Sequence, residues 1–213
     1  MSFVAVRDGL MPVSTIVYNN VTDDTEANKI DVEVTKTTIL GKTAVAKILK
    51  ENCDVTGLAE EDYAENGEFY QFYELHKAAN SCKDNVQAEV ILLENIVIND
   101  EAKVLNITNN QKINLNLSGK QITVSVKDAI INSGELSITD TSTDNAGTIY
   151  FNGDKLIENT GKLNIEGGNI TDNATNGVYM LNQITNKNEL TINTPGTIIA
   201  NIYNYAGNSK LKI

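Results

Sequence analysis

Few side chains in this 213-residue sequence have the types and spacing that acid–base chemistry needs. Asp140 and Asp144 lie four residues apart in a polar stretch, and paired carboxylates could hydrolyse a glycosidic bond between them. A polysaccharide lyase would also need carboxylates that bind calcium and an arginine or lysine base, but the one arginine, Arg7, precedes the repeats described below. The only adjacent aspartates, Asp23 and Asp24, precede them too. The sequence therefore predicts that the chain is not an enzyme, with a depolymerase acting through loop carboxylates as the alternative.

One histidine and two cysteines are the remaining reactive side chains. His76 lies beside the apolar face of a predicted helix, where a structural role is far commoner than that of a general base. Cys53 and Cys82 have no second histidine to activate them, and they lack the partners for a zinc site. A single disulfide and a pair of buried free thiols both fit the pattern. We expect no cofactor and no metal.

Aromatic side chains offer a different chemistry, because rings stack on sugar faces and exclude water. Five of them fall within the repeats: Tyr150, Phe151, Tyr179, Tyr203 and Tyr205. Packing in the core is the commoner role for most of these residues. The alternative is glycan contact, for which Tyr203 and Tyr205 are the candidate pair, since they flank the last repeated asparagine.

A recurring pattern predicts the elements that position these side chains. An asparagine recurs at steps of 18 to 27 residues, and the asparagines are Asn109, Asn132, Asn159, Asn186 and Asn204. Each of the first four is followed by aliphatic residues four and six positions later, and the last repeat is stretched by three residues. A unit that alternates aliphatic and polar residues cannot bury its apolar face alone, so it must stack on its neighbours. The pattern predicts a mainly β fold, a β-solenoid. In it, the stacked asparagines form a structural ladder in which each side-chain amide donates to the next.

The region before the repeats has a different character. Residues 1–65 are predicted to be a small α+β portion with an anchoring or assembly role. Strands are expected at residues 13–18 and 30–34, where apolar and polar residues alternate in the second. Residues 42–51 are predicted to form a short helix with its apolar side chains on one face.

Residues 66–213 are predicted to form the solenoid, with three short sides in each turn and about 4.8 Å between turns. A helix over residues 68–82 carries one apolar stripe. It is expected to cover the open end of the stack, because exposed strand edges invite aggregation. Residues 139–146 and 172–177 read as loops that grow from one corner.

Charge and hydropathy narrow the choice of partners. The chain has 28 acidic and 17 basic residues, a formal net charge of −11, and no basic run, which argues against nucleic acid. No stretch approaches the roughly 18 apolar residues of a membrane span. The first twenty residues lack the basic start and apolar block of a secretory signal peptide. We therefore expect an extracellular or virion-surface protein that either has its signal elsewhere or leaves the cell on lysis.

Four runs of sequence, at residues 70–79, 90–98, 113–123 and 129–140, resemble right-handed parallel β-helix proteins of the pectate-lyase-like superfamily. Within that superfamily they look most like adhesin-like surface proteins of gut bacteria and their phages. The resemblance covers about residues 66–213. It implies an α-helical cap on the first coil and a Leu-Asn-Leu-x-Gly-Lys run in the second. It implies little about activity, because the superfamily includes lyases, hydrolases, tailspikes and passive stalks.

Together these patterns predict a non-enzymatic structural or adhesive protein displayed on a surface. A phage virion component, such as a head or tail fibre or a capsid decoration protein, is the first expectation. A bacterial cell-surface adhesin module is the alternative. The expected partners are other virion or surface-assembly proteins, bound through residues 1–65, and possible glycans. A homotrimer is a possible assembly.

Overall fold

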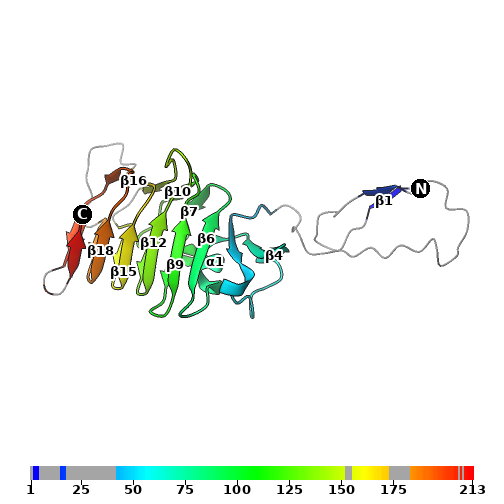
Figure 1. Ribbon diagram of the computed structural model, residues 1–213, viewed down its shortest axis with the longest axis horizontal. Helices are drawn as coiled ribbons and strands as arrows, with labels where there is room; N and C mark the ends of the chain where they lie inside the picture. The colour runs from blue at the N-terminus through cyan, green and yellow to red at the C-terminus, as the bar shows by residue number, and fades with distance from the viewer. Residues whose placement is uncertain are drawn as a thin grey trace, which may run out of the picture.

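Figure 1 shows the computed structural model of the protein, in which parallel strands stack side by side along the molecule. The structure describes residues 2–4, 15–17, 42–151, 155–172, 183–205, 207 and 209–213. Near the N-terminus, β1 (Ser2–Val4) and β2 (Thr15–Val17) form an antiparallel pair. Strand β2 lies within the strand predicted at residues 13–18, whereas the strand predicted at 30–34 falls outside the described residues.

The main body is a β-solenoid of about four turns, as the repeats predicted. Each turn has three sides, and each strand pairs in parallel with the equivalent strand of the next turn. The first side contains β7 (Ile96–Ile98), β10 (Gln121–Val124), β13 (Thr148–Phe151), β16 (Asn169–Asp172) and β19 (Ile198–Ile199). The second side contains β8 (Leu105–Ile107), β11 (Ile130–Asn132), β14 (Ile157–Asn159), β17 (Ile184–Asn186) and β20 (Ile202–Asn204). The third side contains β6 (Gln87–Leu92), β9 (Lys112–Asn116), β12 (Glu135–Thr139), β15 (Lys162–Ile165), β18 (Glu189–Ile192) and β21 (Lys210–Lys212).

Aliphatic side chains form continuous columns inside the three sides. On the third side, Leu136 pairs with Leu163 and Leu163 with Leu190, and none of these three residues has any exposed surface. Successive side chains of a strand point to opposite faces, so a shift of one residue would move each leucine into solvent. Burying one such side chain contributes about 1.5–3 kcal/mol, which makes this register strongly preferred.

The segment before the first coil corrects one prediction. Residues 42–51 were predicted to be helical, and this was wrong: they contain β3 (Ala46–Leu49) and begin the 3-10 turn η2 (Lys50–Asn52). Strand β3 lies between β5 (Phe69–Phe72) and β6 and pairs with both. Ala46 and Ile48 are fully buried, so the segment alternates with the period of a strand.

The predicted helix at residues 68–82 is shorter than expected. Helix α1 spans Leu75–Ser81, because the preceding Phe69–Phe72 segment is β5 and pairs with β3 and with β4 (Tyr63–Asn66). Helix α1 contacts β8, β3 and β5. A second 3-10 turn, η3 (Glu101–Lys103), joins β7 to β8.

The third side continues beyond the parallel coils. Strands β3, β5 and β4 extend it as antiparallel strands next to β6, so that it becomes a nine-stranded sheet. The domain boundary predicted at residue 65 therefore falls inside β4. Strands β3 and β4 thus share one nine-stranded sheet with the parallel strands of the third side.

Candidate functional site

Four of the five predicted ladder asparagines lie in one column at the corner between the second and third sides. Asn132 Nδ2 donates to Asn159 Oδ1 at 2.7 Å, Asn159 Nδ2 to Asn186 Oδ1 at 2.7 Å, and Asn186 Nδ2 to Asn204 Oδ1 at 2.6 Å. The same three nitrogens also donate to backbone carbonyls of the next turn, at 2.8–2.9 Å. Asn132, Asn159 and Asn186 have no exposed surface, so the column satisfies the turning backbone rather than a ligand.

Asn109 is not part of this column, and its prediction as a ladder residue was wrong. Asn132 pairs with Ile107, and the corner between Ile107 and Ile113 is two residues longer than the one between Asn132 and Leu136. The extra length leaves Asn109 exposed in a turn. The Oδ1 atom of Asn132 is buried without a hydrogen-bond partner in the described part of the chain, so the column begins there.

Gln111 occupies the longer corner. Its side chain is almost fully buried, and its Nε2 donates to the carbonyls of Ala79 and Cys82 at 3.1 and 3.2 Å. Its Oε1 accepts from the backbone N–H of Thr108. Gln111 therefore connects the first corner of the solenoid to the C-terminal end of helix α1.

The predicted tyrosine pair lies at the outer face of the last described coil. Tyr203 is in β20 and Tyr205 follows it, and they are 45% and 50% exposed. Their ring centroids are 5.4 Å apart and the rings are almost perpendicular, at 87°. Lys187 Nζ lies 5.7 Å from the centroid of the Tyr205 ring. The two tyrosines are thus brought together, with about half of the surface of each left exposed at the side of the rod.

The register explains which polar groups surround the tyrosines. Tyr203 pairs with Thr185, Thr185 with Glu158 and Glu158 with Ile131, so these residues form one row along the second side. Each lies one position before a ladder asparagine and alternates with the buried column. Of this row, Tyr203 is exposed, Ile131 and Glu158 are partly buried, and Thr185 is buried, with 6% of its surface exposed.

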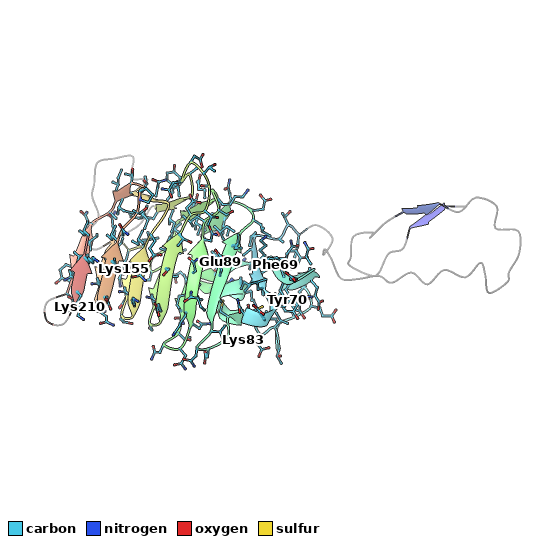
Figure 2. The ribbon with its side chains drawn as sticks, viewed as in Figure 1. Phe69, Tyr70, Lys83, Glu89, Lys155 and Lys210 are labelled. Carbon is cyan, nitrogen blue, oxygen red and sulfur yellow. The ribbon has the colours of Figure 1, made fainter. Side chains whose placement is uncertain are left out.

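A charged cluster is centred on Glu158 of this row, two turns before Tyr203. Glu158 accepts hydrogen bonds from Lys155 and Lys187, and Lys155 also forms an ion pair with Asp128 at 2.9 Å. Figure 2 labels Lys155 on the body of the solenoid. The hydrogen bonds from the two lysines lower the pKa of Glu158 to about 2, so its carboxylate is charged at neutral pH. Tyr203, Tyr205, Lys187, Glu158 and Thr185 are called the tyrosine site below.

Sequence reasoning found the tyrosines but missed the charged members of this site. Glu158 precedes Asn159 and Lys187 follows Asn186, so both occupy positions fixed by the repeat. Aligning the repeats on their asparagines would have placed Glu158, Thr185 and Tyr203 in one row along the second side. That alignment is the signal in the sequence that could have revealed the charged members of the site.

The predicted catalytic alternative at residues 139–146 has a structural role in this fold. Asp140 accepts four hydrogen bonds: from the backbone N–H groups of Gly119, Ser142 and Gly147, and from the Ser142 hydroxyl, at 2.6–3.1 Å. Although burial acts to raise it, these hydrogen bonds together lower the pKa of Asp140 below its usual value. Asp144 is exposed. The Asp140 carboxylate therefore holds its own loop against the preceding turn.

His76 lies in a small polar cluster beside helix α1. Its Nε2 is 3.6 Å from Glu74 Oε2, while Lys103 Nζ contacts Glu74 Oε1 at 2.7 Å. Burial lowers the pKa of His76, which favours the neutral imidazole at pH 7. The adjoining cavity measures about 200 Å³, below the roughly 300 Å³ of the smaller ligand pockets. This cluster is therefore a weaker candidate than the tyrosine site.

The two cysteines are free and buried. Burial raises the pKa of Cys53 to about 11 and of Cys82 to about 12, so neither thiol is a nucleophile at neutral pH. Within the described residues, no three His, Cys, Asp or Glu side chains gather in a way that could hold a metal ion. Among the helices of that same part of the chain, none is long and apolar enough to cross a membrane.

Comparisons with known proteins add no family to this description. No protein-family model, curated protein or solved structure matches the chain. The resemblance noted in the sequence is supported only as far as the solenoid architecture. The function proposed below therefore depends on the tyrosine site and on the solenoid fold.

Proposed function

We propose that this protein is a non-enzymatic structural and adhesive protein, which displays a rigid solenoid on a surface and binds glycans at the tyrosine site. The observation that carries the proposal is the exposed perpendicular pair formed by Tyr203 and Tyr205. Large aromatic rings are usually buried, since each hides about 150–250 Å² of surface when it packs. Two adjacent rings left half exposed offer an apolar platform for a sugar face.

The polar members of the tyrosine site complement that platform. Sugars carry hydroxyl groups around an apolar face, and a binding site needs a few well-placed polar groups to fix their orientation. Lys187 lies next to the Tyr205 ring, and its hydrogen bond to Glu158 holds the ammonium group in place. This arrangement suits recognition of a sugar without its cleavage. The Glu158 carboxylate is engaged by two lysines, which makes it a poor general acid.

The rest of the molecule fits a display role. Parallel coils with aliphatic columns form a stiff body, and helix α1 with strands β3, β5 and β4 adjoins the first coil and acts as its cap. The segment before residue 42 is the anchor to a virion or to a bacterial cell surface. A fibre or decoration protein of a phage and an adhesin module both fit this arrangement.

A glycan array tests the binding proposal. The wild-type chain should be retained on at least one class of glycan, and Tyr203→Ala and Tyr205→Ala should each weaken that retention at least about tenfold, as expected for loss of one ring contact. Tyr150→Ala is the matched control, because Tyr150 is also a tyrosine in a solenoid strand, but on the first side. The control should bind as the wild type does. Circular dichroism should show that all three variants remain folded.

Two results would contradict the proposal. One is an array on which the wild-type chain binds no glycan. The other is equal retention of the wild type and both tyrosine-site variants, which would place binding elsewhere. Release of reducing ends or of unsaturated sugars from acidic glycans would instead favour a depolymerase.

A further inference from the structure

Cys53 and Cys82 face each other across a short antiparallel β-bridge. Cys53 follows the 3-10 turn η2, and Cys82 directly follows helix α1. The bridge is held by hydrogen bonds between the neighbouring residues: Asp54 N–H donates to the Ser81 carbonyl at 2.7 Å, and Lys83 N–H to the Asn52 carbonyl at 3.1 Å. The cysteines are therefore opposite partners that exchange no backbone hydrogen bonds with each other.

This pattern is that of a non-hydrogen-bonded antiparallel pair, in which the Cα atoms lie closer together than in a hydrogen-bonded pair. Residues opposite each other in a pair without its own hydrogen bonds have Cα atoms about 4.5 Å apart, with side chains on the same face. Disulfides join cysteines whose Cα atoms lie about 4.4–6.8 Å apart. A Cys53–Cys82 bond therefore fits this backbone without a rearrangement of the strands.

The two thiols are buried at this bridge, and Cys53 acts electrostatically on Cys82. Cys53 and Cys82 are 4% and 5% exposed, so larger thiol reagents and other protein chains cannot approach them in the folded state. The two thiols donate only weakly, to the carbonyls of Leu49 and Ala78, at 3.5 and 3.6 Å. Neither cysteine belongs to a metal-binding group within the described residues.

We propose that Cys53 and Cys82 form a disulfide bond when the protein folds in an oxidising environment. The oxidant is a disulfide, either a small one such as oxidised glutathione or that of an oxidoreductase. One cysteine thiolate attacks it and forms a mixed disulfide, releasing the first thiol of the reagent. The second cysteine then attacks the mixed disulfide, which forms the Cys53–Cys82 bond and releases the second thiol. The protein loses two electrons and two protons, and the reagent is reduced to two thiols.

The bond should form during folding rather than afterwards. Burial raises the pKa of both thiols well above neutral pH, and Cys53 raises that of Cys82 further, so the folded state contains very little thiolate. Exchange requires the thiolate, so it is fast only while the segment around the bridge is still open to solvent. The same burial protects the finished bond from reductants.

The disulfide would secure the elements that adjoin the first coil. The chain between the two cysteines contains β4, β5 and helix α1, which all pack at this end of the solenoid. Gln111 already connects the carbonyl of Cys82 to the first corner. A covalent bond at Cys82 therefore ties the start of this segment to the point where helix α1 meets the solenoid.

Refolding under defined redox conditions tests the inference with the full-length chain. The protein is unfolded with reductant, refolded in a glutathione redox buffer, quenched with acid and then alkylated in denaturant. The wild type should retain no alkylatable thiol, and non-reducing peptide mapping should yield one fragment that joins Cys53 to Cys82. Protein refolded in reductant should melt roughly 10 °C below protein refolded in the redox buffer, as for the loss of a bond closing a loop of about 30 residues.

The variants Cys53→Ala, Cys82→Ala and the double variant are the controls. Each single variant should retain one alkylatable thiol, and the melting temperature of the double variant should not respond to reductant. Two alkylatable thiols in the refolded wild type would overturn the inference. So would glutathione attached to both cysteines, or disulfide-linked dimers in place of the internal bond.

Discussion

The first and the last coils of the solenoid have similar strands but very different surroundings. At the first coil, α1, β3 and β5 supply buried neighbours, and Ile48, Phe72 and Ala78 have no exposed surface. At the last described coil, Ile199 and Leu211 are 48% and 40% exposed. Figure 2 labels Phe69 and Tyr70 at the first of these ends and Lys210 at the other.

The difference shows that burial in a solenoid depends on stacking rather than on composition. Leu190 and Leu211 occupy the same column and pair directly, yet Leu190 is fully buried while Leu211 is 40% exposed. Each coil covers one face of the next, so a coil with one neighbour loses about half of its apolar contacts. The tyrosine site lies in this less covered region. Exposing its rings there costs little stability, because the apolar side chains of the last described coil are already partly exposed.

The largest predicted effect compares two leucines of that column. Leu163→Ala should lower the free energy of unfolding by about 3 kcal/mol, because it leaves a cavity between two packed coils. Leu211→Ala removes a side chain that is already partly in solvent and should cost less than about 1 kcal/mol. Urea unfolding followed by circular dichroism measures both. Equal losses for the two variants would show that the last coil is covered as well as the middle ones.

A smaller effect is expected in the asparagine column. Asn159→Ala removes one of the two hydrogen bonds of Asn132 Nδ2 and the partner that Asn159 provides to Asn186 Oδ1, and it should cost about 2 kcal/mol of unfolding free energy. Asn204 is exposed, so water can replace its contacts, and Asn204→Ala should cost less than about 0.5 kcal/mol. Urea midpoints give the two values. A larger loss for Asn204→Ala would mean that the column is held from its exposed end.

The smallest predicted effect concerns the charged cluster near the last coils. The pKa of Glu158 is lowered from 4.5 to about 2, so its ion pairs stabilise the fold above about pH 4.5. That contribution should decrease as the pH falls from 4.5 to 2, where the folded-state carboxylate takes up a proton. Solvent screening limits it to about 1 kcal/mol. The stability difference between the wild type and Glu158→Gln, measured by urea unfolding at several pH values, should therefore disappear near pH 2. A stability difference that does not change with pH would mean that the Glu158 side chain acts through packing and not through its charge.

Sequence reasoning succeeded where neighbouring coils repeat each other. The aliphatic columns and the ladder from Asn132 to Asn204 follow from one period, because parallel stacking places equivalent positions side by side. It failed at Asn109, where two additional residues in the corner change the register between adjacent sides. The insertion leaves the local motif intact, so only the pairing of β8 with β11 reveals it.

The segment before the solenoid was harder to predict for another physical reason. Val45, Ile48 and Leu49 fit one face of a helix, and the same stretch also alternates as a strand. The pairing of β3 with β5 and β6 decides between them, and these partners are distant in the sequence. The Lys155–Glu158–Lys187 cluster was missed because it joins adjacent turns across the stack.

The asparagine column has a direction as well as a position. All three amides donate toward the C-terminal end of the rod, so their dipoles add along the axis instead of cancelling. Their oxygen ends point toward the first coil, and their N–H ends point toward Asn204, which lies between the two exposed tyrosines. The column thus carries a small dipole of its own, positive toward the end where the tyrosine site lies.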